Sequence, residues 1–160
     1  VSRMYPAYEP NTVLISNGFA AMGFGLPGGI AAKLVHPEKN VVVITGDGGF
    51  MMNDQELETA CRLKLSIVVV IFVDKEFGLI SWKQMNRFKH KFGVFFNNPD
   101  FVKLAEAYGA VGYRVNATKE LPEILKKSLT HDLPVIIEVP VDYSENIKLT
   151  DKLGKLICPI

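Results

Sequence analysis

The chain has 160 residues, the length of a typical single domain, and its hydrophobic content of 48% is enough to fill a core. Its 18 basic and 17 acidic residues give a formal net charge of +1, so the composition gives no support for a nucleic-acid or anionic-membrane partner. No run of 18 apolar residues predicts a membrane-spanning segment. The two cysteines, Cys61 and Cys158, match no metal-binding spacing, and we expect reduced thiols in a cytoplasmic protein.

Apolar runs rich in β-branched residues alternate with segments of helical period. The clearest apolar runs do not alternate with polar residues, which is typical of strands covered on both faces. We therefore predict one α/β domain over residues 1–160, with an open parallel sheet and helices on both faces. In chain order, the predicted segments are strand 41–45, helix 55–62, strand 67–73, helix 79–91, helix 100–108, strand 110–115, helix 118–128 and strand 135–139.

Local residue types predict where several helices begin and end. Asn53 or Asp54 is available as the N-cap of the helix at 55–62, and Thr118 as the N-cap of the helix at 118–128. Gly109 is the predicted C-cap of the helix that ends at Tyr108.

Two acidic residues follow the first two predicted strands. Asp47 lies in the run Gly46-Asp47-Gly48-Gly49, and Asp74 lies 27 residues further along the chain, a separation that suits a strand end, a crossover helix and a returning strand. Ligands of open α/β sheets bind beyond the carboxyl ends of the strands. Two carboxylates placed there repel each other unless a cation lies between them.

The glycines around Asp47 leave backbone N–H groups free to approach an anion. The helix that starts near Asn53 is expected to point its positive end towards the same place. Carboxylates, exposed amides and helix N-termini together suit Mg²⁺ that carries a phosphorylated ligand. Taken singly, Asp47 fits an ordinary tight turn and Asp74 a solvated loop; their position at two strand ends favours the metal site.

Gly46-Asp47-Gly48, followed by an acid at position 74, resembles the metal-binding signature of thiamine-diphosphate-dependent enzymes, where Asn is usual at the second position. The resemblance covers about residues 12 to 147 and points to the C-terminal diphosphate-binding domain of a catabolic-type acetolactate synthase. The segments that carry it further are Ser16-Asn17-Gly18, 22–27 (MGFGLP), 56–60 (ELETA) and Pro140-Val141-Asp142-Tyr143.

The resemblance implies a role for each matching position. Asp47 and Asp74 would bind Mg²⁺ through their side chains and Glu76 through its backbone carbonyl. The backbone amides expected to hold the diphosphate belong to Gly48, Gly49, Phe77 and Gly78.

Four further positions match groups around the rest of the cofactor. Met22 corresponds to the bulky residue that bends the cofactor, and the carbonyl of Ala20 to the acceptor for its 4′-amino group. Leu79 and Ile80 would approach the thiazolium ring and the substrate.

The implied reaction condenses two molecules of pyruvate to 2-acetolactate with loss of CO₂. The glutamate that activates the cofactor in such enzymes lies in a separate pyrimidine-binding domain of another subunit, and no residue here matches it. The resemblance thus implies a three-domain parent chain, a homodimer or homotetramer, and no activity in the isolated domain. Apolar surface for that assembly is expected at 22–30 and around 79–82. FAD in the parent protein cannot be read from this chain.

Three other interpretations remain open. The residues 23–28 (GFGLPG) have the G-x-G-x-x-G spacing of nicotinamide-binding turns, although no strand is predicted directly before them. A different thiamine-diphosphate-dependent 2-oxoacid decarboxylase or carboligase would carry the same signature. A domain that binds the cofactor without turnover would carry it too.

Overall fold

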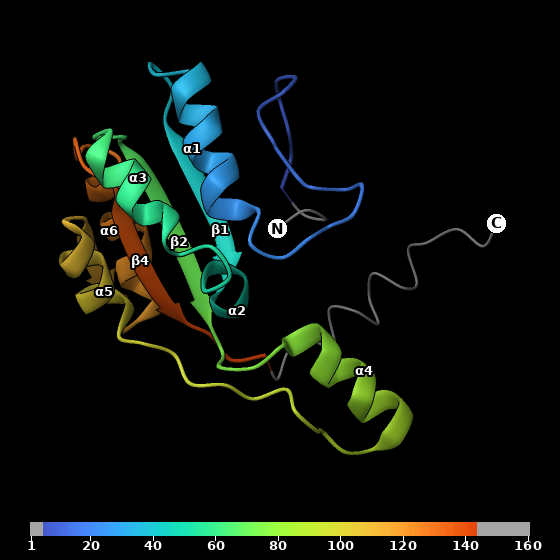
Figure 1. The fold of residues 1–160 in the computed structure, drawn as a ribbon. Helices are drawn as coiled ribbons and strands as arrows, with labels where there is room; N and C mark the ends of the chain where they lie inside the picture. The colour runs from blue at the N-terminus through green and yellow to red at the C-terminus, as the bar shows by residue number, and fades with distance from the viewer. Residues whose placement is uncertain (1–4, 144–160) are drawn as a thin grey trace.

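The structure is a computed structural model and describes residues 5–143. Four parallel strands form one sheet in the order β1-β2-β4-β3, which confirms the predicted open parallel sheet (Figure 1). The strands are β1 (Val41–Gly46), β2 (Ile67–Val73), β3 (Val111–Arg114) and β4 (Val135–Pro140). In the register of the first pair Gly46 lies beside Phe72, so the residues that follow β1 and β2 emerge at the same edge.

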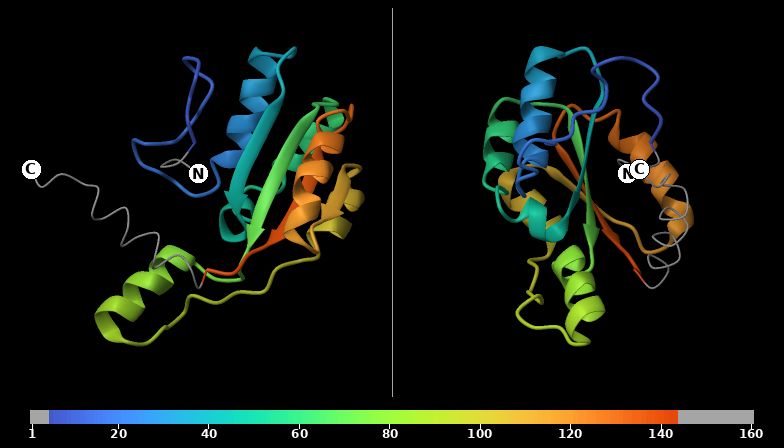
Figure 2. Two further views of the ribbon diagram at one scale, coloured as in Figure 1. Left: turned by 180° about the vertical axis from the view of Figure 1, so that it is seen from behind. Right: turned by 90° about the vertical axis from the view of Figure 1, so that its right-hand side faces the viewer.

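Helices cover both faces of the sheet, as predicted. Strand β2 is buried almost throughout because Val69 and Ile71 face one layer of helices while Val68 and Val70 face the other. The first layer contains α1 (Gly25–Val35), α3 (Glu56–Arg62) and α5 (Phe101–Tyr108), and the second contains α6 (Leu121–Ser128). The two layers lie on opposite sides of the strands in the right-hand view of Figure 2.

Helix α1 was not among the predicted helices. Its sequence contains three glycines and a proline, which disfavour helix, and it forms because it packs on β1. A side chain at Gly29 would collide with Val43, so glycine permits this close approach. Leu26 and Ile30 are buried against the sheet, and the prediction that 22–30 is surface is therefore wrong for these two residues.

The nicotinamide-binding interpretation of 23–28 also loses support. No strand precedes α1 in residues 5–24, whereas a dinucleotide-binding turn needs one directly before the glycines.

Two predicted N-caps are wrong. At α3, Gln55 occupies the N-cap position and no side chain caps the helix, while the Asn53 amide donates to the Gly23 carbonyl at 3.0 Å. Thr118 lies inside the short 3₁₀ helix η1 (Thr118–Glu120), whose start is stabilised when the Glu120 carboxylate accepts from the Asn116 and Ala117 backbone amides.

Two helices frame the carboxyl edge of the sheet. The four-residue helix α2 (Asp47–Phe50) follows β1 directly, where only a turn was predicted. Helix α4 (Gly78–Phe88) follows β2 and extends beyond the sheet (Figure 1). It ends three residues earlier than predicted because Lys89 adopts a left-handed backbone conformation with φ of 61°. In the described part of the chain, no helix is long and apolar enough to span a membrane.

Gly109 confirms the predicted C-cap of α5, with φ of 84°. We expect Gly109→Ala to destabilise the domain by about 1 kcal/mol, because a Cβ disfavours this backbone conformation. The control is Gly18→Ala, where φ is not left-handed and a Cβ meets nothing within 4 Å. Thermal unfolding of both variants tests this; equal midpoints would contradict it.

Candidate functional site

Asp47 joins three segments of chain at the carboxyl edge of the sheet. It directly follows β1, its side chain is buried at 2% exposure, and its Oδ1 accepts a hydrogen bond from the Gly48 amide at 2.8 Å. Its Oδ2 accepts from the backbone amides of Asp74 at 3.2 Å and Lys75 at 2.8 Å, and from the Asn98 side-chain amide at 2.7 Å. The carboxylate is thus held by backbone that follows β1, by backbone that follows β2 and by a distant side chain.

Asp74 lies next to this carboxylate, as its position after β2 predicted. Burial is the largest cause that raises the pKa of Asp74 above its ordinary value, and the negative charges of Asp47 and Glu76 raise it further. A hydrogen bond from the Glu76 amide, at 3.3 Å, opposes this increase. Two neighbouring carboxylates of this kind favour a cation between them.

The loop after β2 is held in place by the segment that returns from α4. Lys75 has a left-handed φ of 62°, and its carbonyl accepts from the Phe96 amide at 3.2 Å. The Phe77 amide donates to the Val94 carbonyl at 2.9 Å, and Glu76 pairs with Phe95 in an antiparallel bridge. The turn 75–77 therefore has a defined conformation beside the two acids.

Two glycines lie where a side chain would disturb this arrangement. A Cβ at Gly48 would stand 3.0 Å from the Phe77 ring and 3.2 Å from the Phe96 ring. A Cβ at Gly78, the first residue of α4, would stand 3.0 Å from Asp74 Oδ2. Glycine at position 48 therefore lets two aromatic rings lie against the backbone, and glycine at position 78 lets Asp74 do so.

The side chain of Glu76 is bound by two other side chains and is therefore not available as a metal ligand. It accepts from Lys91 Nζ at 2.9 Å and from the buried Ser81 hydroxyl at 3.2 Å. This geometry is compatible with the predicted use of its backbone carbonyl.

The remaining predicted residues lie around this centre on exposed segments. Met22 is 45% exposed, and Ala20 has a left-handed φ of 53° in the loop before α1. The hydrogen bond from the Asn53 side chain to the Gly23 carbonyl holds this loop beside the chain that follows α2. Leu79 and Ile80, on the first turn of α4, are 67% and 50% exposed. The structure thus places Asp74 beside Asp47 and Gly78 beside Asp74, while the other four predicted residues lie on exposed segments.

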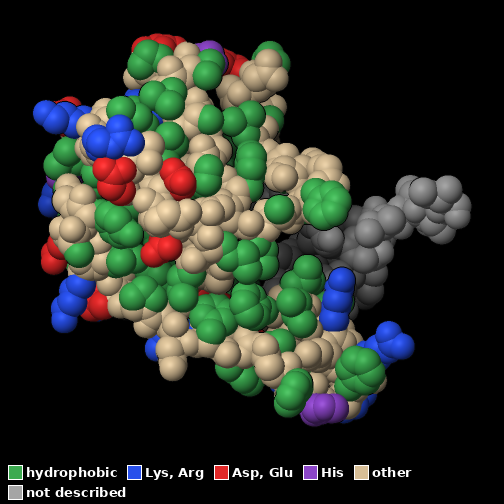
Figure 3. Space-filling view, in the orientation of Figure 1, with side chains coloured by type: hydrophobic (Ala, Val, Ile, Leu, Met, Phe, Trp, Pro, Cys, Tyr) green, Lys and Arg blue, Asp and Glu red, His purple; other side chains and the backbone are tan. Residues whose placement is uncertain are grey.

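The apolar surface predicted around 79–82 is present. Leu79, Ile80 and Trp82 are exposed, and Met85 and Phe88 extend the exposed apolar side chains along α4. Figure 3 shows hydrophobic side chains gathered over this protruding part of the molecule, mixed with basic ones.

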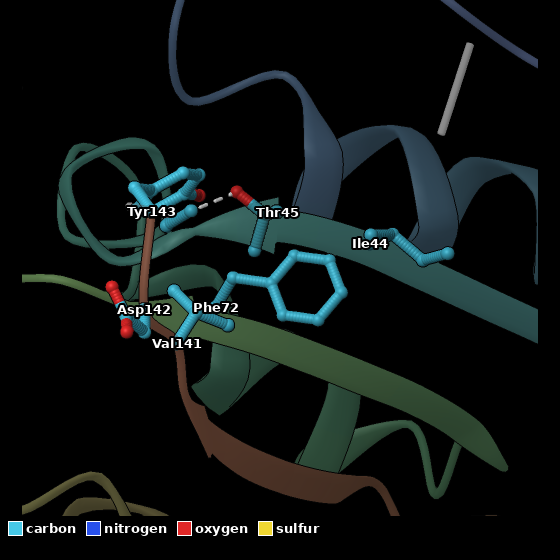
Figure 4. A pocket seen from close by; sticks show the side chains of 7 residues that line it. Ile44, Thr45, Phe72, Val141, Asp142 and Tyr143 are labelled. Atoms are coloured by element: carbon cyan, nitrogen blue, oxygen red, sulfur yellow. Dashed lines mark hydrogen bonds between the residues drawn. The ribbon is translucent and has the colours of Figure 1, made fainter. Parts of the chain in front are cut away.

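A hollow of about 420 Å³ opens at the ends of β1 and β2, where Thr45, Phe72 and Tyr143 lie on its wall (Figure 4). Burial raises the pKa of the Tyr143 hydroxyl on its wall, and the charges of Asp74 and Asp47 raise it further, so the acids influence this hollow. Asp142 and Tyr143, from the segment 140–143 that carries the resemblance, also lie here. Together with Ile44, Thr45, Gly46, Phe72 and Val141, they line the hollow.

Asn98 is the residue of the site that sequence reasoning missed. It lies 51 residues after its partner Asp47, in a run of polar residues that resembles an ordinary loop. Its Oδ1 is buried and has no hydrogen-bond partner among the described residues. No periodicity or spacing signals such a contact.

The described donor set fits Mg²⁺ with a diphosphate better than a transition metal. No group of three or more His, Cys, Asp or Glu side chains that could hold a metal occurs between residues 5 and 143. Two carboxylates therefore need further oxygen ligands from backbone, water or phosphate, which is the mixture that Mg²⁺ prefers.

Comparison with known proteins agrees with this geometry. The family model for the thiamine pyrophosphate enzyme, C-terminal TPP binding domain, matches residues 1–139. Acetolactate synthase of Bacillus subtilis is 44% identical over 97% of this chain, and catabolic acetolactate synthase of Raoultella terrigena is 37% identical over 96%. The chain spans 27% of the length of each of these relatives.

A solved structure shares the fold. The thiamine diphosphate-dependent 4-hydroxybenzoylformate decarboxylase of Rhodococcus jostii superposes with a TM-score of 0.73 at 30% identity, over 78% of this chain and 24% of that protein. The matched fold, the matched family model and the acid pair at the strand ends lead to one conclusion: the chain belongs to the family of C-terminal thiamine-pyrophosphate-binding domains of thiamine pyrophosphate enzymes.

Proposed function

We propose that this domain binds the diphosphate of thiamine diphosphate through Mg²⁺, as part of an acetolactate synthase. The observation that carries the proposal is the close approach of Asp47 and Asp74 at the ends of β1 and β2, where the Asp74 amide donates to Asp47 Oδ2. The identity of 44% to the Bacillus subtilis acetolactate synthase supports the choice of activity.

In this proposal Asp47 and Asp74 bind Mg²⁺ through their carboxylates, and Glu76 through its backbone carbonyl. Within residues 5–143, Asp47 Oδ1 accepts one hydrogen bond, so it keeps acceptor capacity for a metal. The Lys91–Glu76 ion pair keeps the Glu76 side chain off the metal and fixes its backbone.

Four backbone amides were expected to hold the diphosphate, but those of Gly48 and Phe77 already donate to Asp47 Oδ1 and to the Val94 carbonyl. The amides of Gly49 and Gly78 would donate to the diphosphate oxygens. Gly78 begins the 11-residue helix α4, and the first amides of a helix have no partner within the helix. They are therefore suited to an anion that lies next to Asp74.

When bound, the cofactor supplies the carbon nucleophile and the electron sink for decarboxylation of a 2-oxoacid. Met22 would press against its bridge, and the Ala20 carbonyl would accept from its amino group. Leu79 and Ile80 would exclude water beside the substrate, for which we propose pyruvate.

The catalytic unit in this proposal is larger than the chain. A pyrimidine-binding domain of another subunit would supply the activating glutamate, within a three-domain chain that assembles as a homodimer or homotetramer. The exposed apolar side chains on α4 support such a contact. A cytoplasmic location remains a prediction.

A second activity has specific support. The structural match to a 4-hydroxybenzoylformate decarboxylase shows that the same fold occurs in an enzyme named for simple decarboxylation of a 2-oxoacid. The complete protein, supplied with pyruvate, thiamine diphosphate and Mg²⁺, should form 2-acetolactate and at most traces of acetaldehyde. Acetaldehyde as the main product would favour the decarboxylase, and no turnover of any 2-oxoacid would favour a non-catalytic domain.

Removal of one carboxylate should abolish metal-dependent binding. In calorimetric titrations of the complete protein, we expect Asp74→Ala to weaken Mg²⁺-dependent binding of thiamine diphosphate by about 100-fold or more, because a metal ligand is lost. Asp74→Asn, which keeps an oxygen ligand, should retain binding. Asp132→Ala removes an exposed acid away from the site and is the control. Binding that survives Asp74→Ala would contradict the proposed metal site.

The glycine at the start of α4 offers a second test. Gly78→Ala should weaken binding of thiamine diphosphate by about tenfold, because the new Cβ displaces Asp74 Oδ2 and crowds the diphosphate. Gly109→Ala is the control, since it makes the same substitution at the C-cap of α5, before the amino end of β3 and away from the carboxyl edge of the sheet. Similar affinities for the two variants would count against a diphosphate at this position.

A further inference from the structure

The segment that returns from α4 to the sheet and ends at Asn98 contacts both the turn 75–77 and Asp47. It is connected to α4 when the Gln84 side chain donates to the Phe92 carbonyl at 3.0 Å and accepts from the Phe92 amide at 2.9 Å. Lys91, just before Phe92, forms an ion pair with Glu76. Further along the segment, the Phe96 ring packs on the Phe77 ring with centroids 4.8 Å apart. These contacts bring the end of the segment, at Asn98, to the ends of β1 and β2.

Asn98 is the single side chain among the described residues that donates to Asp47. The other three donors are the backbone amides of Gly48, Asp74 and Lys75. The bond from Asn98 Nδ2 to Asp47 Oδ2 is the shortest of the four, at 2.7 Å. Three donors on Oδ2 against one on Oδ1 fix the rotation of the carboxylate and leave Oδ1 with the greater free acceptor capacity.

The other end of the Asn98 amide is unsatisfied. Its Oδ1 is buried and has no hydrogen-bond partner in the described part of the chain, a state that is destabilising for a polar atom. The reverse orientation of the amide would place Oδ1 against Asp47 Oδ2, oxygen to oxygen, so the hydrogen bond to Asp47 determines the orientation. A donor that arrives with the ligand would remove the cost, and Mg²⁺ usually retains water molecules that can donate.

We propose that Asn98 is a positioning residue for the metal site: it orients the Asp47 carboxylate so that Oδ1 faces Mg²⁺. The inference rests on the proposed function, because it requires Asp47 to be a metal ligand. Asn98 should affect the affinity for the metal rather than for the diphosphate, since it has no described contact with the glycines that would hold the diphosphate. Residues that orient a metal ligand commonly change metal affinity by about 10- to 100-fold.

The experiment is a Mg²⁺ titration of the complete protein at saturating thiamine diphosphate, followed by calorimetry or intrinsic fluorescence. We expect Asn98→Ala to raise the Kd for Mg²⁺ by about tenfold. At saturating Mg²⁺, the Kd for thiamine diphosphate should stay within about twofold of the original value, because the metal site is then full. Asn97→Ala, at the exposed neighbouring position, should leave both constants unchanged.

A second variant separates positioning from packing. Asn98→Leu keeps a side chain of similar volume and removes the donor, so it should raise the Kd for Mg²⁺ as much as Asn98→Ala does. Circular dichroism and thermal unfolding without metal show whether each variant is folded. A role in packing alone would lower the unfolding midpoint in Asn98→Ala, spare Asn98→Leu and leave the Mg²⁺ requirement unchanged in folded protein; that result would overturn the inference.

The outcomes also separate this inference from the proposed function. If the original protein binds thiamine diphosphate in a Mg²⁺-dependent way and neither Asn98 variant alters the Kd for Mg²⁺, the inference is wrong and the proposed function stands. An equal change in Asn97→Ala would likewise exclude a specific role for Asn98. If the original protein shows no Mg²⁺-dependent binding, the proposed function and the inference both fail.

Discussion

The buried carboxylate of Asp47 is the constraint on which the site depends. A charge at 2% exposure is tolerated only when hydrogen bonds replace its water, and here four donors from three separate segments do so. The parallel register of β1 and β2, with Gly46 beside Phe72, brings two of those segments together. A shift of this register would move the Asp74 and Lys75 amides away from the carboxylate, so sheet pairing and site geometry stabilise the same arrangement.

The need for hydrogen bonds to the buried Asp47 carboxylate also explains why the irregular turn 75–77 is well defined. The turn 75–77 includes a left-handed residue at Lys75, a conformation that costs free energy outside glycine. Backbone hydrogen bonds to Val94 and Phe96, together with the amide of Lys75 on Asp47, offset that cost. Helix α4 and its return segment therefore act as the support of this turn, although both lie beyond the sheet (Figure 1).

The sequence predicted the parts of the molecule in which local pattern and tertiary environment agree. Strand β2 is apolar throughout because both of its faces are buried, and the acids are recognisable because strand ends fix their place. Helix α1 was missed because its glycines oppose helix locally and serve close packing on β1 instead. Asn98 was missed for a different reason: its partner is 51 residues away, and a loop asparagine looks the same whether it faces solvent or a carboxylate.

The distribution of burial separates the site into two parts with different physical requirements. Asp47 and the residues that fix it are buried or held by several bonds, as an ion-binding centre needs, because small displacements of a ligand change metal affinity. Met22, Leu79 and Ile80 are exposed apolar side chains on the border of that centre, where nothing in the described chain covers them. Apolar groups beside a preformed ionic centre gain free energy when another surface covers them, and closing that surface also excludes water from the ions and strengthens their interactions. In the function proposed above, such a domain would hold the charged end of the ligand, while the apolar end would become a dry reaction site on association with another surface.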